Sequence, residues 1–358
     1  MEILYHLFLL FIVFLLLFYP VIYISKLEFF KKNKKYKIIL YIVFLLLGTI
    51  FFFIDELYTI GILSHVMIIF FVVNFICFLI RKIFSFRVSR LIQIIIVFTF
   101  STIYLTIGYY NAVNVVRTYY SFDTNKDIID ENIRIALISD SHIGLTISAS
   151  NLKDSLDRIK KDNPDMLVIT GDFVDDRTSK KDMIESVNCF KDYSFKYGIY
   201  YIDGNHDKGY FSSRGFTIEE LYDEFNKNGV TILKDDVINI NDNVYLVGRE
   251  DKSYKNRKSF DSLIEAIDND KYIITLDHQP NDYNNELGSD LVLSGHTHGG
   301  QIWPLGPISS LFHINDLVYG TKRIDNTDFV VTSGISEWGL KFKTFTKSEY
   351  VIIDINKK

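Results

Sequence analysis

The stretch IRIALISDSH at residues 133–142 decides the fold of the second half of the chain. Its first seven residues form a predominantly apolar run of strand length, which predicts a buried strand. Asp140 and His142, whose side chains are common metal ligands, follow at the point where that strand would end. In open α/β sheets, sites form just beyond the carboxyl ends of the strands. One such pair is a weak sign of a metal site, whereas its recurrence along the chain is a strong one.

The arrangement does recur. Four more apolar runs of strand length are each followed by polar residues, and these runs lie at 166–170, 198–202, 271–276 and 290–294. Helical spacing of apolar residues between the first three strands predicts helices at 151–161 and near 179–193. Three further strands are expected at 244–248, 328–333 and 349–354. The alternation of strands and helices is typical of an α/β domain.

Each of the four runs at 166–170, 198–202, 271–276 and 290–294 is followed by at least one residue of metal-binding type. The residues that follow them are Gly171 and Asp172, the sequence GNHD at 204–207, His278, and the sequence GHTH at 295–298. Together with the loop that carries His142, these loops contain five of the eight histidines of the chain, which argues against chance placement. Divalent metals used in phosphate chemistry accept carboxylate, amide and imidazole ligands, and a pair of ions clamps the attacking and leaving oxygens. Asp172 is the expected bridge between two ions, because Gly171 removes side-chain bulk beside it.

Composition excludes several other classes of site. The chain has only two cysteines, Cys77 and Cys189, so neither a disulfide framework nor a cysteine-based zinc site can form. The formal net charge is -5, and no basic concentration occurs in the second half, so no nucleic-acid partner is expected. Trp303 and Trp338 lie in glycine-containing loops, where they would either line a substrate cleft or pack in the ordinary way.

The ordered set of strand-end motifs resembles that of the calcineurin-like metallophosphoesterases. The motifs are DSH at 140–142, GD at 171–172, GNHD at 204–207, His278 and GHTH at 295–298. The resemblance covers residues 132–355, and the run GHTHGGQ at 295–301 is similar to the bacterial membrane-associated branch, which includes enzymes like UDP-2,3-diacylglucosamine hydrolase. It implies a four-layer α/β/β/α sandwich, in which two mixed sheets pack face to face between helices.

The resemblance also implies a role for each motif residue. One divalent ion would be bound by Asp140, His142, Asp172 and His298. The second would be bound by Asp172, Asn205, His278 and His296. His206 would act near the leaving group, with Asp207 orienting its imidazole. The two ions, expected to be Mn, Fe or Zn, would activate a water molecule for in-line attack on the phosphorus of a mono- or diester.

The first part of the chain is of a different kind. Four apolar stretches have the length that a bilayer-spanning helix needs, and they lie at 3–24, 38–54, 58–80 and 91–112. We therefore expect residues 1–115 to form a multi-pass membrane anchor, residues 116–131 to form a polar linker, and residues 132–358 to form the metallophosphoesterase domain.

The charged loops predict how this anchor is oriented. The loop after the first stretch carries six lysines between Lys26 and Lys37, and the loop after the third carries four basic residues between Arg81 and Arg90. Lysine and arginine are retained on the cytoplasmic side, so both loops are expected there. The link between the second and third stretches contains Asp55, Glu56 and no basic residue, as expected for the opposite face. Residues 120–358 would then lie outside the cell membrane.

Three functions are compatible with this pattern. The first is hydrolysis of a phosphate ester of a lipid headgroup or a lipid-linked envelope precursor, because the linker is too short to carry the domain far from the bilayer. The second is a non-catalytic metal-binding sensor of the same fold, for which missing ligands would be expected, and none is missing. The third is an accessory domain of a transporter, for which charged residues at span centres would be expected, and none is present. The oligomeric state stays open.

Overall fold

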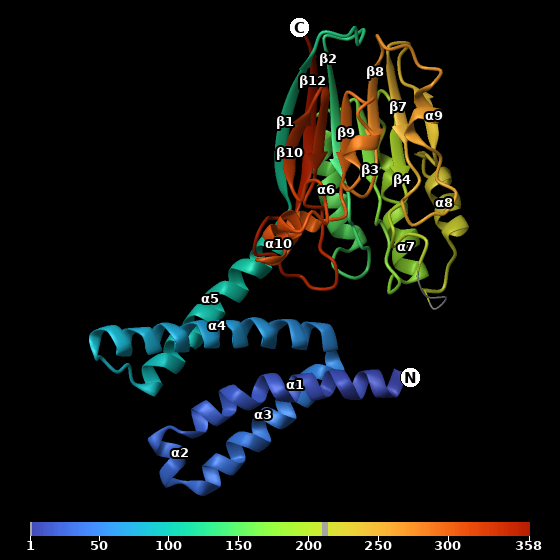
Figure 1. The fold of residues 1–358 in the computed structure, drawn as a ribbon. Coiled ribbons are helices and arrows are strands. Elements are labelled where there is room, and N and C mark those ends of the chain that lie inside the picture. Colours follow the sequence, from blue (N-terminus) through green and yellow to red (C-terminus); the bar gives the residue numbers. More distant parts are fainter. Residues whose placement is uncertain (1, 210–213) are drawn as a thin grey trace. The chain divides into compact units, whose positions relative to one another are not determined.

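A computed structural model describes residues 2–209 and 214–358. The chain forms two compact units, Met1–Gly108 and Tyr109–Lys358 (Figure 1). The first unit is helical and the second contains all the strands that the structure describes. The change in composition seen in the sequence therefore corresponds to a change in architecture.

The first unit consists of helices that match the predicted apolar stretches. They are α1 (Glu2–Ser25), the short α2 (Glu28–Lys32), α3 (Lys34–Ile54), α4 (Glu56–Phe84) and α5 (Arg90–Val113), whose last residues belong to the second unit. Among the described residues, four helices, all but α2, are long and apolar enough to cross a membrane. Only 11–22% of their most apolar windows is buried within the protein, so these helices present apolar side chains outward, as helices surrounded by hydrocarbon do.

The second unit is built on two mixed sheets. The first has the order β1-β12-β2-β3-β4-β5 and consists of β1 (Val116–Thr124), β12 (Glu349–Lys357), β2 (Asn132–Ile138), β3 (Met166–Thr170), β4 (Ile199–Ile202) and β5 (Val230–Ile232). Strands β2 to β5 run parallel, whereas β12 is antiparallel to β2. The carboxyl ends of β2, β3 and β4 therefore meet at one edge of this sheet.

The second sheet is also mixed and six-stranded. Its order is β10-β11-β9-β8-β7-β6, and it consists of β10 (Gly320–Ile324), β11 (Thr327–Val331), β9 (Leu291–Ser294), β8 (Tyr272–Leu276), β7 (Val244–Gly248) and β6 (Asp236–Asn239). Strands β7, β8, β9 and β11 are parallel, and only the outer pairs are antiparallel. All eight strands expected from the sequence are present in the two sheets.

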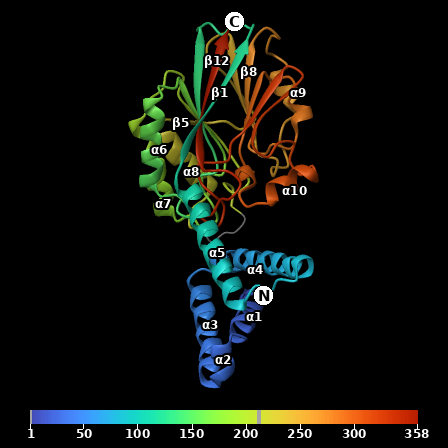
Figure 2. The same cartoon turned by 90° about the vertical axis from the view of Figure 1, so that its left-hand side faces the viewer.

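Apolar residues from both sheets pack between them, including Ile135 and Val168 of the first sheet and Leu246 and Leu293 of the second. The outer face of the first sheet is covered by α6 (Ala149–Lys161), α7 (Lys180–Val187) and α8 (Ile218–Lys227). Figure 2 shows these helices on one side of the sheets, and α9 (Phe260–Ile264) and α10 (Leu305–Leu311) on the other. The expected four-layer α/β/β/α sandwich is confirmed. Short 3-10 turns lie at Phe190–Asp192, Tyr283–Asn285 and His298–Gly300.

The prediction of a linker at 116–131 is wrong for the first nine residues of that range. Val116–Thr124 is β1, which pairs in parallel with β12 along its whole length. It is an edge strand with alternating exposed and partly buried residues, and Tyr120 and Phe122 pack on the core between the sheets. Its outward polar side chains give it the composition of a loop, and the pairing that stabilises it comes from the far end of the chain. Only two residues separate α5 from β1.

Candidate metal centre

The predicted ligands meet at one edge of the sandwich. Asp140 and His142 follow β2, and Asp172 follows β3, while His296 and His298 follow β9 of the other sheet. Within the described part of the chain, two groups of side chains are close enough to hold a metal ion each. One is Asp140, His142 and His298, and the other is Asp172, His278 and His296; in each group the ligand atoms lie within 4.8 Å of one another. All six residues are among the ligands that the family resemblance implied, which also gave Asp172 to the first ion and Asn205 to the second.

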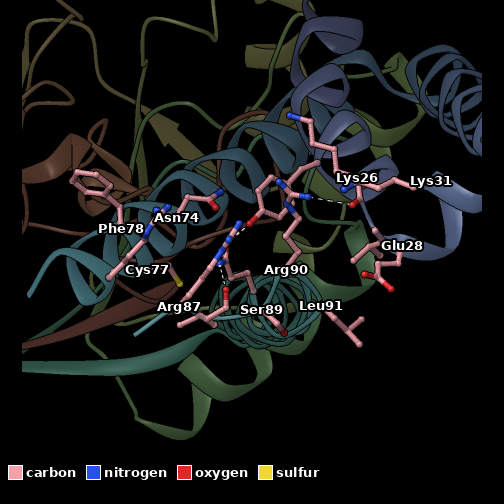
Figure 3. A pocket seen from close by; sticks show the side chains of 15 residues that line it. Lys26, Glu28, Lys31, Asn74, Cys77, Phe78, Arg87, Ser89, Arg90 and Leu91 are labelled. Atoms are coloured by element: carbon pink, nitrogen blue, oxygen red, sulfur yellow. Dashed lines mark hydrogen bonds between the residues drawn. The ribbon is translucent and has the colours of Figure 1, made fainter. Parts of the chain in front are cut away.

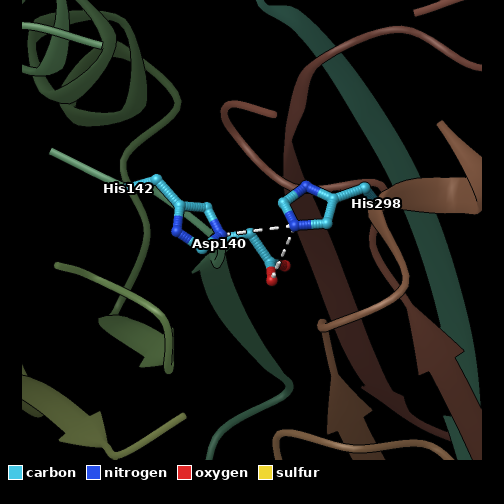
Figure 4. Close-up of side chains that lie close together, drawn as sticks. All are labelled: Asp140, His142 and His298. Atoms are coloured by element: carbon cyan, nitrogen blue, oxygen red, sulfur yellow. Dashed lines mark hydrogen bonds and ion pairs between the residues drawn. The ribbon is translucent and has the colours of Figure 1, made fainter. Parts of the chain in front are cut away.

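The first group points two imidazole nitrogens at the same space (Figure 4). His298 Nε2 lies 3.3 Å from His142 Nε2 and 3.7 Å from Asp140 Oδ1. The other ring nitrogens face acceptors, because His298 Nδ1 lies 3.2 Å from the Ser336 carbonyl and His142 Nδ1 lies 3.3 Å from Asp175 Oδ2. With a proton on each Nδ1, both Nε2 atoms present lone pairs to each other, an arrangement that a cation between them stabilises.

The second group is arranged in the same way. His278 Nδ1 donates to the Thr170 carbonyl at 2.7 Å, which directs Nε2 inward. His278 Nε2 lies 3.2 Å from both Asn205 Oδ1 and Asp172 Oδ2. The His296 ring packs edge-on against the His278 ring, with 5.1 Å between the centroids. Carboxylate, amide and imidazole donors therefore converge here, as the chemistry of divalent phosphate-processing metals requires.

Asp172 is the side chain that connects the two groups. Its Oδ2 lies 3.2 Å from His278 Nε2 in the second group and 3.9 Å from His142 Nε2 in the first. Its Oδ1 accepts the backbone N–H of His206 at 2.8 Å, which holds the carboxylate in this orientation. This is the position that a bridging ligand would occupy.

The backbone of the site is strained where the ligands are. Left-handed φ angles occur at Asp140 (56°), His142 (41°), Asp172 (51°), His296 (70°) and His298 (49°). Each such residue costs roughly 1–2 kcal/mol relative to right-handed backbone. Strain of this kind persists where the surrounding structure over-determines it, and it concentrates at functional sites.

Glycines allow these loops to pack backbone against backbone. A Cβ on Gly171 would lie 2.6 Å from the Gly204 nitrogen and 2.7 Å from His278 Nδ1, and the φ of Gly171 is +86°. A Cβ on Gly204 would collide with the side chain of Asp172. Both glycines are therefore required by the close approach of the loops after β3 and β4.

Burial shapes the electrostatics of the centre. It raises the pKa of Asp140, and it lowers the pKa of His296 to about 4 and that of His298 well below its usual value. Burial alone would also raise the pKa of Asp172 and lower that of His278, but each stabilises the charge of the other, so the Asp172 pKa is held low and the His278 pKa high. The neutral imidazoles of His296 and His298, together with the charged carboxylate of Asp172, are donors suited to a divalent cation.

His206 lies beside the two groups, but Asp207 does not orient it, contrary to the expectation from the resemblance. Asp207 is fully buried, and its two oxygens accept the backbone N–H groups of Val174 (2.9 Å) and Gly204 (2.7 Å). It therefore stabilises the loops. The carboxylate near the ring is Asp175, whose Oδ2 lies 3.7 Å from His206 Nδ1.

Asp175 is the site residue that sequence reasoning missed. The same oxygen that faces His206 also faces Nδ1 of His142, so one buried carboxylate serves both rings. Burial raises the pKa of Asp175, but the hydrogen bond and charge of His142 lower it further, so that the pKa lies below its usual value. The available signal was a second aspartate three residues after Asp172, in the same strand-end loop. Trp338 also borders the site, with its ring 6.0 Å from that of His206.

Comparison with known proteins gives a consistent result. Residues 133–300 match the family model described as calcineurin-like phosphoesterase. An uncharacterized metallophosphoesterase of Campylobacter jejuni is 30% identical over 250 residues, covering 66% of this chain and 63% of its own length. One of Helicobacter pylori is 29% identical over 241 residues, covering 65% and 62%. A transmembrane protein with metallophosphoesterase domain from Danio rerio is 27% identical over 235 residues, covering 61% and 52%. The alignments thus span less than two thirds of each relative.

Proposed function

Because this chain carries a calcineurin-like metallophosphoesterase domain, we propose that it hydrolyses phosphate mono- or diesters at the centre formed by its two donor groups. The observation that carries the proposal is the Asp172 carboxylate, which lies within 3.9 Å of an imidazole nitrogen of each group. A centre for a single ion has no need for such a shared carboxylate. The sensor alternative would expect missing ligands, and every predicted ligand is present.

The residues divide into those that hold ions and one that meets the substrate. Asp140, His142 and His298 would hold one divalent ion, His278, His296 and Asn205 the other, and Asp172 both. Two such ions lower the pKa of a water molecule and neutralise charge on the phosphoryl oxygens. His206 belongs to neither group, and its partly exposed ring would donate a hydrogen bond to a phosphoryl or leaving oxygen, with Asp175 stabilising a proton on Nδ1.

We also propose that the domain lies outside the cell membrane, because the basic loops after α1 and α4 favour the cytoplasm. The test uses Asn326→Cys, an exposed position between β10 and β11, in a chain whose Cys77 and Cys189 are replaced with alanine. An impermeant thiol reagent should label this cysteine on intact cells. A cysteine at Lys34 should be labelled only after lysis. The reverse pattern would overturn the orientation.

The surface beside the centre supports a substrate at the membrane. Large apolar side chains are exposed on α10 and the neighbouring loops, and we call this set the apolar surface: Trp303, Leu305, Ile308, Leu311, Phe312, Ile314, Trp338 and Phe345. Residues 302–314 contain no Asp, Glu, Lys or Arg. Leu311 is 73% exposed and Phe312 is 69% exposed, which is unusual for such residues on a surface that meets only water.

The apolar surface is attached to the metal centre. The Gln301 amide, three residues after His298, donates to the carbonyls of Trp338 (3.1 Å) and Leu340 (3.3 Å), which ties the two loops that carry this surface. Three residues after Phe345 of this surface, the Ser348 N–H donates to the Asn111 carbonyl at 3.1 Å, in the last turn of α5. Since α5 is a candidate membrane span, a surface that adjoins its end is suited to contact lipid. We therefore infer that the substrate phosphate belongs to a lipid headgroup or a lipid-linked precursor.

A double variant of the apolar surface tests this substrate class. In vesicles containing the full chain and manganese, Leu311→Asp with Phe312→Asp should lower kcat/KM for a lipid-linked phosphodiester by about tenfold or more, because burial of each side chain in lipid contributes roughly 1.5–3 kcal/mol. Hydrolysis of a water-soluble phosphodiester should change much less. The control is Ile129→Asp, at an apolar residue that is 54% exposed in the loop before β2, outside the apolar surface.

The same vesicles provide a direct readout of lipid contact. Trp303 and Trp338 are the only tryptophans of the chain, and both belong to the apolar surface. Lipids brominated near the headgroup should therefore quench the intrinsic fluorescence, and the double variant should abolish this quenching. Undiminished fluorescence, together with equal loss of activity on both substrates, would show that the surface does not meet the membrane.

A further inference from the structure

The first unit contains a cavity that the proposed hydrolysis does not use. It has a volume of about 660 Å³ and lies among the end of α1, α2, the end of α4 and the start of α5 (Figure 3). Five basic side chains line it: Lys26, Lys31, Arg81, Arg87 and Arg90. Glu28 is the single acidic residue in the lining. The cavity is therefore strongly positive.

These positive charges are not neutralised within the first unit. In the described part of the chain, none of the five basic side chains forms an ion pair. Arg90 Nη1 donates to the Lys26 carbonyl at 3.2 Å, and its guanidinium lies 5.8 Å from the centre of the Tyr23 ring, which positions it without cancelling its charge. Like charges held around one space repel each other, so an anion in that space would be stabilised.

The inner wall of the cavity is also polar, although it belongs to apolar helices. Asn74 of α4 and Gln93 of α5 both line it. The Asn74 amide nitrogen donates to the Phe70 carbonyl at 2.9 Å, and Gln93 accepts a hydrogen bond from the Tyr23 hydroxyl. Polar side chains within candidate membrane spans are costly unless they face other polar groups, and they mark sites of function. Hydrocarbon is thus a poor occupant for this part of the cavity.

We propose that this cavity binds the phosphate group of an anionic lipid headgroup. Arginine matches the oxygens of a phosphate bidentately, and three of the five basic side chains are arginines. Phe78 and Leu91 supply an apolar part of the lining, which suits the acyl end of the same molecule. In the orientation proposed above, the cavity faces the cytoplasmic leaflet, where anionic lipids attract basic segments. This inference does not depend on the hydrolytic activity.

Ordinary retention of basic loops in the cytoplasm does not account for the cavity. That effect needs only positive charge near the ends of the spans, in any geometry. Lys34 and Lys37 supply such charge from the first turn of α3, and they do not line the cavity. The two explanations therefore differ in which basic residues matter.

The test compares two double variants that remove equal charge from the full chain in detergent micelles. Arg81→Gln with Arg87→Gln removes cavity charges that make no hydrogen bond elsewhere in the described structure, whereas Lys34→Gln with Lys37→Gln removes charges outside it. Phosphatidylglycerol retained per chain is measured by native mass spectrometry, with phosphatidylcholine and inorganic phosphate as further probes. The arginine variant should bind phosphatidylglycerol about tenfold more weakly or worse, because it loses two charged groups that would contact the phosphate. The lysine variant should bind within about twofold of the parent, because these charges do not line the cavity and act on it only through screened solvent.

Each other outcome has a defined meaning. Equal weakening in both variants would show a diffuse positive surface and overturn the proposed site. Inorganic phosphate that binds as tightly as phosphatidylglycerol would assign the cavity to soluble phosphate compounds and overturn the lipid assignment. Phosphatidylcholine retained as well as phosphatidylglycerol would show that net negative charge is not recognised, which would also overturn it.

Discussion

Replacing Asp172 with asparagine is expected to lower the metal content of both sites together and to reduce turnover by more than the roughly 10–100-fold that loss of an outer-shell partner costs. The substitution keeps the volume of the side chain and the acceptor that binds the His206 N–H. It removes the negative charge that faces both His278 and His142. A bridging ligand stabilises two cations at once, so its loss should affect the two sites in a correlated way. Metal per chain is measured by elemental analysis alongside activity.

The matched control is Asp203→Asn. Asp203 is also buried, and it lies just beyond the end of β4, but it contacts the hydroxyls of Tyr222 and Tyr254 and no imidazole of the two groups. The Asp203→Asn substitution should therefore leave the metal content close to that of the parent. Loss of one ion with full retention of the other in Asp172→Asn would show that the carboxylate does not bridge.

Replacing His206 with alanine is expected to reduce turnover by about 10²–10⁴-fold while both ions are retained. A reduction of this size is usual when a side chain that exchanges a proton or hydrogen bond with the reacting group is lost. Its ring is outside both donor groups, and its Nδ1 faces Asp175, so it is placed beside the proposed ions without being one of their ligands. Activity and metal content are measured on the same preparation.

A substitution of a surface histidine separates this effect from a general loss of imidazole. His313 is exposed and belongs to none of the five strand-end loops, so His313→Ala should change neither the metal content nor the activity on a water-soluble phosphodiester, which is the substrate used for both variants. Metal loss in His206→Ala as severe as in Asp172→Asn would assign His206 to the ligands and would contradict the role proposed for it.

The strands that position the centre were predictable because each is a short buried run with an unmistakable apolar signal. Met166–Thr170 and Leu291–Ser294, for example, are entirely buried and lie in the interior of their sheets. Parallel strands that are buried on both faces have little freedom in composition. The residues at their carboxyl ends stand out against that background, so Asp172 and His296 were identified as members of one site although they are far apart in the chain.

Edge elements carried no such signal. The strand β1 has one face in solvent, and β10 is mostly exposed, so neither differs in composition from a loop. The helix α10 was not predicted either, because its apolar residues face outward and do not form the stripe of a helix that packs on a core. These elements depend on partners from distant parts of the sequence or on surroundings outside the protein.

The sequence by itself determined the two-part architecture, the interior strands of the sandwich and the residue types of the metal centre, because burial and ligand chemistry restrict which amino acids can stand at those positions. Only the tertiary structure decided which carboxylate serves His206. Asp207 is its neighbour in the chain, yet the loop after β4 turns the Asp207 side chain toward backbone amides, and the packing of the β3 loop brings Asp175 within 3.7 Å of the ring. Adjacency along a chain does not fix the direction of a side chain, since that direction follows from how the loops of different strands pack together.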